Sequence, residues 1–346
     1  MGWNSFFEEQ LEKYKVELEG LRIGRVAIRE GIACQLLAPE AITVNIGKAS
    51  FDHNDKMVTG DWIAFDPVNS LINFVFDRKS EVVRKVAGDR TEVQPLVANV
   101  DSIFITTAIG EDFNAGRIER YLAAVWSSHA EPIILVTKSD LEHDKEKIIA
   151  ELKSVSPHVP IVFSSMYDPR ETLLKWVPKG KTVALLGSSG VGKSTIVNRI
   201  ANTDFKTNTV REKDQKGRHT TTQRILIPIP DGGLIVDTPG IRELSLWDAD
   251  VGVRRLFEDV VKASTSCKFR DCKHEGEPGC GIGQAIKEGV FTQERLERYK
   301  KLQRENVFFD NRVSELKKQK AHSKKISKAV RNTKKRKPRH EYEHED

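Results

Sequence analysis

One segment of the chain has the residue types and the spacing of a phosphate-binding loop. It consists of Gly187, Ser188, Ser189, Gly190, Val191, Gly192, Lys193 and Ser194, followed by Thr195. The segment fits G-x-x-x-x-G-K-[ST], with an apolar run before it and a helix-length segment after it. Its glycines let backbone N–H groups curl around a β-phosphate, and the helix N-terminus adds its dipole. We therefore expect Lys193 to contact the β- and γ-phosphate oxygens of a nucleoside triphosphate and Ser194 to ligate Mg²⁺.

A second motif, Asp-Thr-Pro-Gly at residues 237–240, ends another apolar run, GLIVD. P-loop nucleotide hydrolases need a carboxylate at such a strand end to hold Mg²⁺. The motif therefore predicts that Asp237 belongs to the magnesium site and that the N–H of Gly240 contacts the γ-phosphate.

Residues 137–140 have the composition of a base reader. Thr137, Lys138, Ser139 and Asp140 follow the run PIILV and resemble N-K-x-D, the guanine reader of GTPases, with Thr in place of Asn. Guanine offers two donors, N1–H and N2–H₂, which the Asp140 carboxylate can accept together, whereas adenine lacks this pair. The Lys138 stem is expected to pack on the ring. A hydroxyl replaces only part of the bonding of an Asn amide, so Thr137 bears on nucleotide affinity more than on base choice.

The loop that contacts guanine O6 is expected at Ser164 and Ser165, directly after the run PIVF. Ordinary GTPases run from the phosphate loop through two switch segments to the base reader and the base-contact loop. Here both base-side segments precede the phosphate loop in the sequence. A doubly wound sheet tolerates such a permutation because its termini often lie close together.

The segment KGRHTTT, residues 216–222, lies where switch I belongs. Switch I supplies a Thr hydroxyl to Mg²⁺; by alignment with related GTPases we choose Thr221, with Thr220 second. Ile241 stands where many GTPases have the Gln that orients the attacking water, and an alkyl side chain cannot do this. His219 is therefore the candidate catalytic residue, the alternative being an exposed His without a chemical role.

Three thiols and one imidazole occur within fourteen residues, at Cys267, Cys272, His274 and Cys280. A closed Cys₃His set suits one tetrahedral Zn²⁺ and leaves no position open for a substrate, so the site is expected to be structural. Cys34 stands alone among β-like residues and is expected to be a buried core thiol.

The spacing of apolar residues changes along the chain and predicts different secondary structure in different segments. Residues 1–20 have the apolar spacing of a helix. Residues 22–92 contain short β-like runs separated by Gly, Asp and Asn, which predicts a small all-β barrel or sandwich without distinguishing an OB-fold from an SH3-like barrel. From Val100 onward, apolar strands alternate with helix-length segments, which predicts a parallel sheet covered on both faces. Helical segments after Trp247 flank the cysteine cluster.

Composition excludes a membrane-spanning or secreted protein. The 346 residues are 38% hydrophobic and 31% charged, with a mean hydropathy of −0.45, and no run approaches the roughly 20 apolar residues of a membrane span. The N-terminus is charged and has no apolar signal core. We therefore expect a cytoplasmic protein.

The net charge of +6 is unevenly distributed. Twelve Lys or Arg residues and no Asp or Glu lie between Lys317 and Arg339. Removing these twelve from the 56 Lys and Arg leaves 44 against 50 Asp and Glu, a net of −6 for the remainder. Such a basic block is normally disordered and its usual partner is a polyanion; the alternative is a solvated tail without a partner.

Taken together, the chain resembles the small-ribosomal-subunit-dependent GTPase A (RsgA) family of circularly permuted bacterial GTPases, over about residues 20–310. The resemblance is carried by the permuted order and by GSSGVGKST, GRHTTT, DTPGI, CKFRDCKHEGEPGC and QPLVANVDSIFI. It implies an OB-fold, a P-loop GTPase domain and a zinc-bearing helical domain. It also implies hydrolysis of GTP to GDP and phosphate, stimulated by the small ribosomal subunit during its late maturation. Departures from the family pattern are Thr137 for Asn, Ser165 for a frequent Ala, and the long basic tail.

The predicted chain is thus multi-domain, and we expect a monomer whose partners are the small subunit and its rRNA, with no membrane and no DNA. Its parts are an N-terminal helix at 1–20, an OB-fold barrel at 21–95, a circularly permuted α/β GTPase domain at 96–247, a zinc-binding helical domain at 248–312 and a basic tail at 313–346.

Three classes of function fit these residues. The favoured one is an enzyme whose GTP cycle times its release from the small subunit. The second is an RNA-binding module with GTP as a structural ligand, against which Lys193, Ser194 and Asp237 argue. The third is a GTPase with another RNA or ribosomal target, such as the large subunit.

Overall fold

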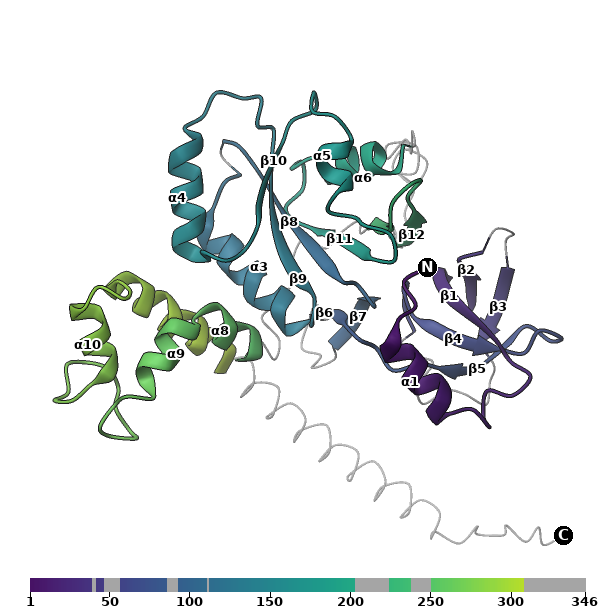
Figure 1. Ribbon diagram of the computed structural model, residues 1–346, viewed down its shortest axis with the longest axis horizontal. Coiled ribbons are helices and arrows are strands. Elements are labelled where there is room, and N and C mark those ends of the chain that lie inside the picture. Colours follow the sequence, from purple (N-terminus) through teal and green to yellow (C-terminus); the bar gives the residue numbers. More distant parts are fainter. Residues whose placement is uncertain are drawn as a thin grey trace, which may run out of the picture.

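The computed structural model describes residues 1–38, 42–46, 57–85, 93–110, 112–202, 224–237 and 250–307. In this part of the chain a β-barrel, a central α/β sheet and a group of C-terminal helices follow one another, with the sheet in the middle (Figure 1). No helix within these ranges is long and apolar enough to cross a membrane.

The first helix, α1 (Ser5–Lys13), covers one side of the barrel. Asn4 caps it, its side chain accepting the N–H of Phe6 at 3.1 Å, as short polar side chains do at helix starts. Phe7 is buried and packs against Trp62 of the barrel, with ring centroids 5.8 Å apart. The N-terminal helix is present but shorter than the predicted span of residues 1–20, since residues 14–20 form turns. Its apolar side covers the barrel.

Five strands close the barrel in the order β1-β2-β3-β5-β4. They are β1 (Arg22–Glu30), β2 (Ala33–Leu36), β3 (Ile42–Ile46), β4 (Trp62–Phe65) and β5 (Leu71–Val75). Pairing is antiparallel except between β3 and β5, and a closed five-stranded barrel of this kind is an OB-fold. Cys34 is fully buried in its core beside Val26 and Val44, which confirms the predicted core thiol.

The β-like run at residues 81–85, which the sequence pattern assigns to the barrel, lies outside the barrel. Strand β6 (Glu81–Lys85) pairs with β7 (Val93–Ala98) in a separate two-stranded antiparallel sheet. The run is β-structured, as predicted, but its hydrogen-bonding partner comes later in the chain instead of from the barrel.

The central sheet has six strands in the order β10-β9-β8-β11-β13-β12. They are β8 (Ser102–Ala108), β9 (Glu131–Thr137), β10 (Ile161–Ser164), β11 (Thr182–Leu186), β12 (Ile225–Pro228) and β13 (Leu234–Asp237). All neighbours are parallel except β12 and β13. The parallel strands are buried along almost their whole length, as the apolar runs predict.

Helices cover both faces of this sheet, as expected from the sequence. Helices α3 (Ala115–Ser127) and α4 (Lys145–Val155) pack on one face. Helices α5 (Glu171–Leu174) and α6 (Lys193–Ala201) pack on the other. Strands β8, β9 and β10 precede β11 in the chain, so the fold has the permuted connectivity.

The C-terminal helices α8 (Asp250–Leu256), α9 (Glu258–Ser264), α10 (Gly281–Lys287) and a last helix over residues 293–307 lie beside α3 (Figure 1). Gly252 allows α8 to approach α3 closely, because a Cβ there would lie 1.8 Å from the carbonyl oxygen of Ala123. Its N–H donates to Ser127 Oγ at 3.0 Å. The helical unit is thus packed directly against the central domain.

Candidate functional site

The predicted nucleotide residues meet at one edge of the central sheet, where its parallel strands end. Thr137, the last residue of β9, pairs with Ala108 of β8 on one side and with Ser164 of β10 on the other. Leu186, just before the phosphate loop, is level with Ile105 on β8. Segments that are far apart in the sequence therefore converge at this carboxyl edge, which is where open α/β sheets bind ligands.

The loop after β11 has the backbone of a phosphate-binding loop. At Gly187 a Cβ would lie 2.3 Å from the carbonyl oxygen of Thr106, so only glycine fits against the neighbouring strand. Gly192, directly before α6, has a left-handed backbone with φ +94°, which glycine adopts without strain. Helix α6 then begins at Lys193, so its N-terminal N–H groups face the concave side of the loop.

Two charged side chains hold this loop. Lys193 Nζ donates to the carbonyl oxygens of Gly187, at 2.8 Å, and of Ser188. On the other side, Ser188 Oγ donates to the carboxylate of Asp112, which also pairs with Arg117 at 2.8 Å. Lys193 thus lies where phosphate oxygens would replace backbone carbonyls.

Asp112 is a site residue that the sequence interpretation missed. Its second oxygen accepts the N–H of Ala108 at 3.2 Å, so it fixes the end of β8 as well as the phosphate loop. The sequence feature that could have indicated Asp112 is its position shortly after β8, the strand that lies beside β11 and its phosphate loop.

Two of the three candidate magnesium ligands, Ser194 and Asp237, belong to elements that meet at this edge. Val236 pairs with Ala184, so Asp237 ends β13 level with Leu185. Ser194 lies in the first turn of α6. A hydroxyl and a carboxylate are the hard oxygen donors that Mg²⁺ takes, so the residues present fit this ion.

Thr137 connects the base reader to the phosphate loop. Its hydroxyl is buried, at 4% exposure, and lies 2.7 Å from the carbonyl oxygen of Val191 and 3.1 Å from that of Thr107. One hydroxyl proton serves one of these acceptors at a time. The bond to the loop gives Thr137 a physical role where the family pattern has Asn; direct contact with nucleotide stays a prediction.

The turn after Thr137 presents the other base-reader residues to solvent. Lys138 has a left-handed backbone with φ +55°, and its carbonyl oxygen accepts the N–H of Leu141 at 3.0 Å. Ser139 N–H donates to the carbonyl oxygen of Ser164 at 3.3 Å. Lys138 and Asp140 are exposed, so the structure brings the turn beside the base-contact loop and leaves both side chains accessible.

Ser165 is used within its own loop. Its N–H donates to Asp168 Oδ2 at 2.7 Å, and its hydroxyl donates to Asp168 Oδ1 at 2.9 Å. A family Ala at this position has no hydroxyl for the second bond, so the departure from the family pattern adds a local constraint. The expected contact with guanine O6 stays a prediction.

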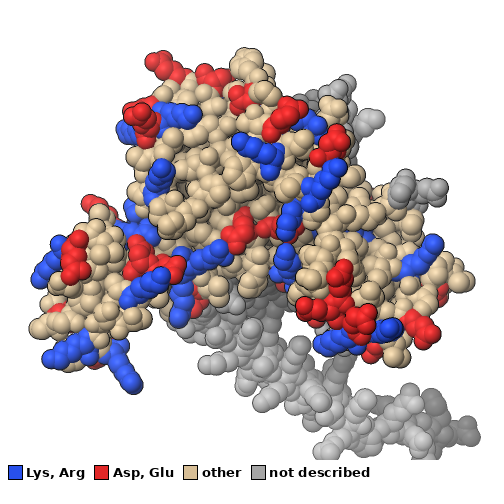
Figure 2. Space-filling model, viewed as in Figure 1, with Lys and Arg blue, Asp and Glu red and all other residues tan. Residues whose placement is uncertain are grey.

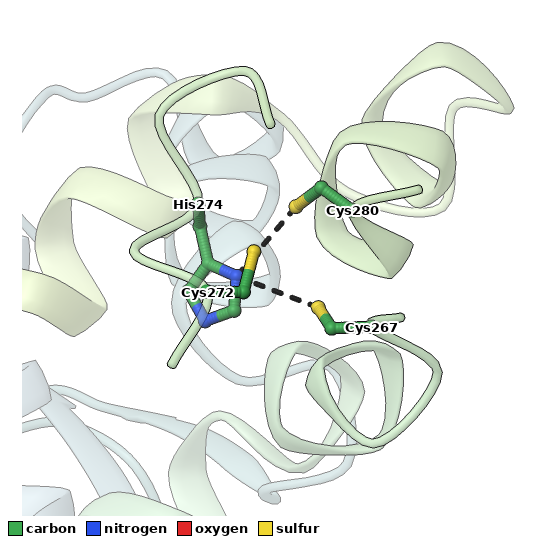
Figure 3. A group of neighbouring side chains, drawn as sticks. All are labelled: Cys267, Cys272, His274 and Cys280. Atoms are coloured by element: carbon green, nitrogen blue, oxygen red, sulfur yellow. Dashed lines mark hydrogen bonds between the residues drawn. The ribbon is translucent and has the colours of Figure 1, made fainter. Parts of the chain in front are cut away.

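The cysteine cluster forms a compact metal-binding geometry (Figure 3). The ligand atoms of Cys267, Cys272, His274 and Cys280 lie within 4.8 Å of one another. His274 Nδ1 is 3.6 Å from the sulfurs of both Cys267 and Cys280. Zn–S bonds of about 2.3 Å and Zn–N bonds of about 2.0–2.1 Å give a tetrahedron with S···N edges of about 3.6 Å. The residues present therefore fit one Zn²⁺.

The loop that carries His274 is supported by Glu277, which the sequence interpretation also missed. Its carboxylate accepts the N–H groups of Lys273 at 2.8 Å and of Glu275 at 2.7 Å, on either side of the ligand. Backbone N–H groups of Glu277 itself, Glu275 and Lys273 lower the pKa of this carboxyl to about 2. Its charge therefore fixes the loop across the physiological pH range.

Several predicted residues fall outside the part of the chain that the structure describes. They are His219, Thr221, Gly240 and the basic tail at residues 313–346.

Comparisons with known proteins agree with this geometry. A family model described as RsgA GTPase matches residues 75–247. A Vibrio vulnificus protein named "Small ribosomal subunit biogenesis GTPase RsgA 2" is 39% identical over 313 residues, which cover 89% of this chain and 87% of that protein. The chain belongs to the RsgA GTPase family. It is therefore a GTP-hydrolysing enzyme, and the nucleotide of its carboxyl edge is a guanine nucleotide.

A second relative and two solved structures are also similar to most of the chain. A Methanosarcina acetivorans protein named "Small ribosomal subunit biogenesis GTPase RsgA" is 38% identical over 316 residues, covering 89% of this chain and 85% of that one. The crystal structure of YjeQ from Thermotoga maritima superposes with a TM-score of 0.60 at 26% identity, over 82% of this chain and 97% of that one. YloQ, titled a circularly permuted GTPase, superposes with a TM-score of 0.58 at 23% identity, over 86% and 97%, and shows the shared fold.

Thr137→Val should weaken guanine-nucleotide binding in this RsgA-family GTPase. Valine keeps the volume but leaves the carbonyl oxygens of Val191 and Thr107 without their donor, and a buried unpaired group costs about 1–3 kcal/mol. Part of this loss should appear as weaker GDP binding in titration calorimetry, because the phosphate loop loses an anchor. Thr137→Ser keeps the hydroxyl and should stay near wild type. A valine variant with unchanged affinity would show that the bond does not support binding.

Purified protein should carry about one zinc per chain, as a four-ligand site requires. Cys272→Ser should abolish zinc binding and raise hydrogen exchange over residues 250–307, because the metal contributes directly to local folding. GDP affinity should be largely retained, since the cluster lies outside the central sheet. Cys34→Ala removes a thiol elsewhere and should keep the zinc. Metal analysis that finds no zinc in protein prepared without chelator would refute the assignment.

Proposed function

We propose that this GTPase acts on the small ribosomal subunit and its rRNA during late subunit biogenesis. The observation that carries the proposal is the extent of the similarity. Relatives named small ribosomal subunit biogenesis GTPases match about nine-tenths of the chain, well beyond the GTPase sheet. Sequence similarity that includes the barrel and the zinc-binding helices supports a shared partner, because those flanking units are not needed for nucleotide hydrolysis.

The charge distribution supports a polyanionic partner. On the face drawn in Figure 2, basic and acidic side chains are interspersed over all three units, and the chain outside residues 317–339 has a net charge of −6. The twelve Lys and Arg residues at 317–339 are therefore the largest run of like charge in the chain. We assign it to phosphate contacts with RNA, whose strength depends on released counterions.

We propose the following organisation around this activity. The domains are bounded at residues 21–95, 96–247 and 248–312, between an N-terminal helix and the basic tail, with the β6–β7 pair outside the barrel at the first boundary. The protein is a monomer that works in the cytoplasm. Guanine is recognised by Thr137, Lys138, Ser139, Asp140, Ser164 and Ser165. The phosphates are held by residues 187–195 and Gly240.

We assign the reaction of GTP to the following residues. When bound to Ser194, Thr221 and Asp237, Mg²⁺ neutralises charge on the β- and γ-phosphates. Lys193 adds a second positive charge on the same oxygens. Ile241 cannot orient a water molecule, so we assign that role to a ring nitrogen of His219, which must be fixed by the partner before it acts.

Asp140→Asn should change the preferred base. The substitution places an NH₂ donor opposite a guanine donor, so GTP and GDP should bind much more weakly. Xanthine has a carbonyl where guanine has its amino group, so XTP should then bind better than GTP. Titration of GTP, XTP and ATP against both proteins checks this. Equal binding of ATP and GTP by the wild type would remove the basis of the base assignment.

The proposed partner is tested by co-sedimentation with separated small and large ribosomal subunits, together with GTP turnover. Binding and acceleration by the small subunit alone are the expected result. Stimulation by the large subunit instead would assign another ribosomal target, and no turnover with either would favour a structural role for the nucleotide.

His219→Ala should abolish most of the subunit-stimulated rate while nucleotide affinity and subunit binding stay near wild type. Losing a positioned acid–base or orienting group typically costs about 10²–10⁴-fold. His158, exposed at the opposite end of the sheet strands, offers a control, and His158→Ala should keep the full stimulation. If His219→Ala keeps its stimulated rate within roughly threefold of wild type, the water is positioned by other groups.

A further inference from the structure

Arg199 links the helix of the phosphate loop to the loop on the base side. It lies on α6, whose first residue is Lys193. Its guanidinium donates to the carbonyl oxygens of Ser165 and Asp168, to that of Pro169 at 3.1 Å and to Ser164 Oγ at 3.4 Å. One side chain therefore binds acceptors on four of the six residues in the loop over residues 164–169.

Other bonds attach the two ends of the loop. Ser164 O accepts the N–H of Ser139 at 3.3 Å, and Arg170, directly after the loop, donates to Ile200 O of α6 at 2.9 Å. Asp168 accepts the N–H and the hydroxyl of Ser165, but these bonds are internal to the loop. Tyr167 N–H donates to Ser165 Oγ at 3.2 Å, again within the loop. Met166 and Tyr167 are 68% and 77% exposed, so apolar packing does not fix this tip. Between its two ends, the loop is joined to α6 by the side-chain bonds of Arg199.

The planar guanidinium suits this task. It offers five N–H donors in a fixed geometry, which allows one side chain to fix several acceptors together. All the acceptors belong to one loop, and the donor belongs to the helix that begins at the phosphate loop. Arg199 therefore joins the part of the loop between its two ends to the helix that carries the phosphate contacts.

We propose that Arg199 is a positioning residue for guanine recognition. It holds residues 164–169 so that backbone N–H groups of the loop face guanine O6 at the correct distance from the bound phosphates. The inference rests on the proposed function, in which this loop reads O6 and Asp140 reads N1–H and the 2-amino group. Arg199 does not touch the base; it determines specificity through the loop.

The proposal is tested with two analogues that separate the two halves of the base site. In 6-thio-GTP a sulfur, a weaker acceptor than oxygen, replaces O6, so the ratio of GTP to 6-thio-GTP affinity reports on the loop. ITP keeps O6 and lacks the 2-amino group, so the ratio of GTP to ITP affinity reports on Asp140. Affinities are measured by titration calorimetry on the full chain.

Arg199→Ala should lower GTP affinity by roughly tenfold, the effect of losing one hydrogen bond of about 1.4 kcal/mol. The preference for GTP over 6-thio-GTP should fall by a similar factor, while the preference for GTP over ITP stays at its wild-type value. Arg199→Lys keeps one charge but cannot reach all the acceptors, so its preference for GTP over 6-thio-GTP should be intermediate.

Arg120→Ala is the matched control. Arg120 lies on α3, on the opposite face of the sheet, and binds Glu305 through two of its nitrogens at 3.1 and 3.3 Å. Its removal also deletes a guanidinium contact, but both base ratios should remain at wild type. Thermal melting of all variants checks that differences in affinity are not differences in folding.

The possible outcomes separate the inference from the function on which it rests. If the wild type binds ATP as well as GTP, the proposed guanine recognition fails and the inference fails with it. If the wild type is guanine-selective but Arg199→Ala keeps the wild-type preference for GTP over 6-thio-GTP, the inference alone fails. If both ratios collapse together in Arg199→Ala, Arg199 supports the whole base site and the assignment to O6 is overturned.

Discussion

One buried guanidinium bonds both the barrel and the GTPase sheet. Arg25 is 1% exposed and donates to Gly60 O at 3.2 Å, Asn99 O at 2.8 Å, Thr182 Oγ1 at 2.8 Å and Met1 O at 2.7 Å. Burial lowers its pKa to about 10, against the opposing pull of Asp101 and Asp61, so it remains charged at neutral pH. Thr182 begins β11, the strand that ends at the phosphate loop. A buried charge is tolerated only when its hydrogen bonds are satisfied, which ties the barrel to one orientation.

The zinc-binding helices are attached by the same kind of interaction. Arg295, 9% exposed, binds both carboxylate oxygens of Asp259, at 2.7 and 3.0 Å, and the carbonyl oxygen of Leu256 at 2.9 Å, all within its own unit. It also donates to Val155 O, at the end of α4, at 3.2 Å. The apolar core is continuous from α3 into these helices, but apolar contact is non-directional. The directional bonds of Arg295 therefore help to orient the unit on the sheet, together with those from Gly252 to Ser127 and from Arg120 to Glu305.

Sequence reasoning could find the residues whose type is dictated by ligand chemistry, and it missed those whose role is to hold backbone. The candidate phosphate loop, base-reader turn and Cys₃His cluster could be picked out because phosphate, guanine and zinc each require particular groups at fixed spacing. Arg25, Arg199 and Arg295 bind mainly carbonyl oxygens, which every residue has, and most of these acceptors are distant in the sequence. No pattern of residue types marks such a bond. The strand over residues 81–85 was assigned to the barrel for a related reason. A β-like run in a sequence does not show which other strand it pairs with.

The phosphate loop is consequently joined to both flanking units by short, directional routes. One runs along β11, from the bond between Arg25 and Thr182 to Gly187. The other passes from Ser188 to Asp112, at the start of α3, and along that helix to Glu119, which pairs with Arg298 of the last helix at 3.3 Å. A hydrogen bond to a charged group is worth about 1.5–3 kcal/mol. A displacement of Ser188 that costs less than breaking its bond to Asp112 therefore moves the start of α3 with it. The permuted order adds to this effect. The chain leaves β13 at Asp237, the proposed magnesium ligand, and next reaches α8 of the C-terminal helical unit.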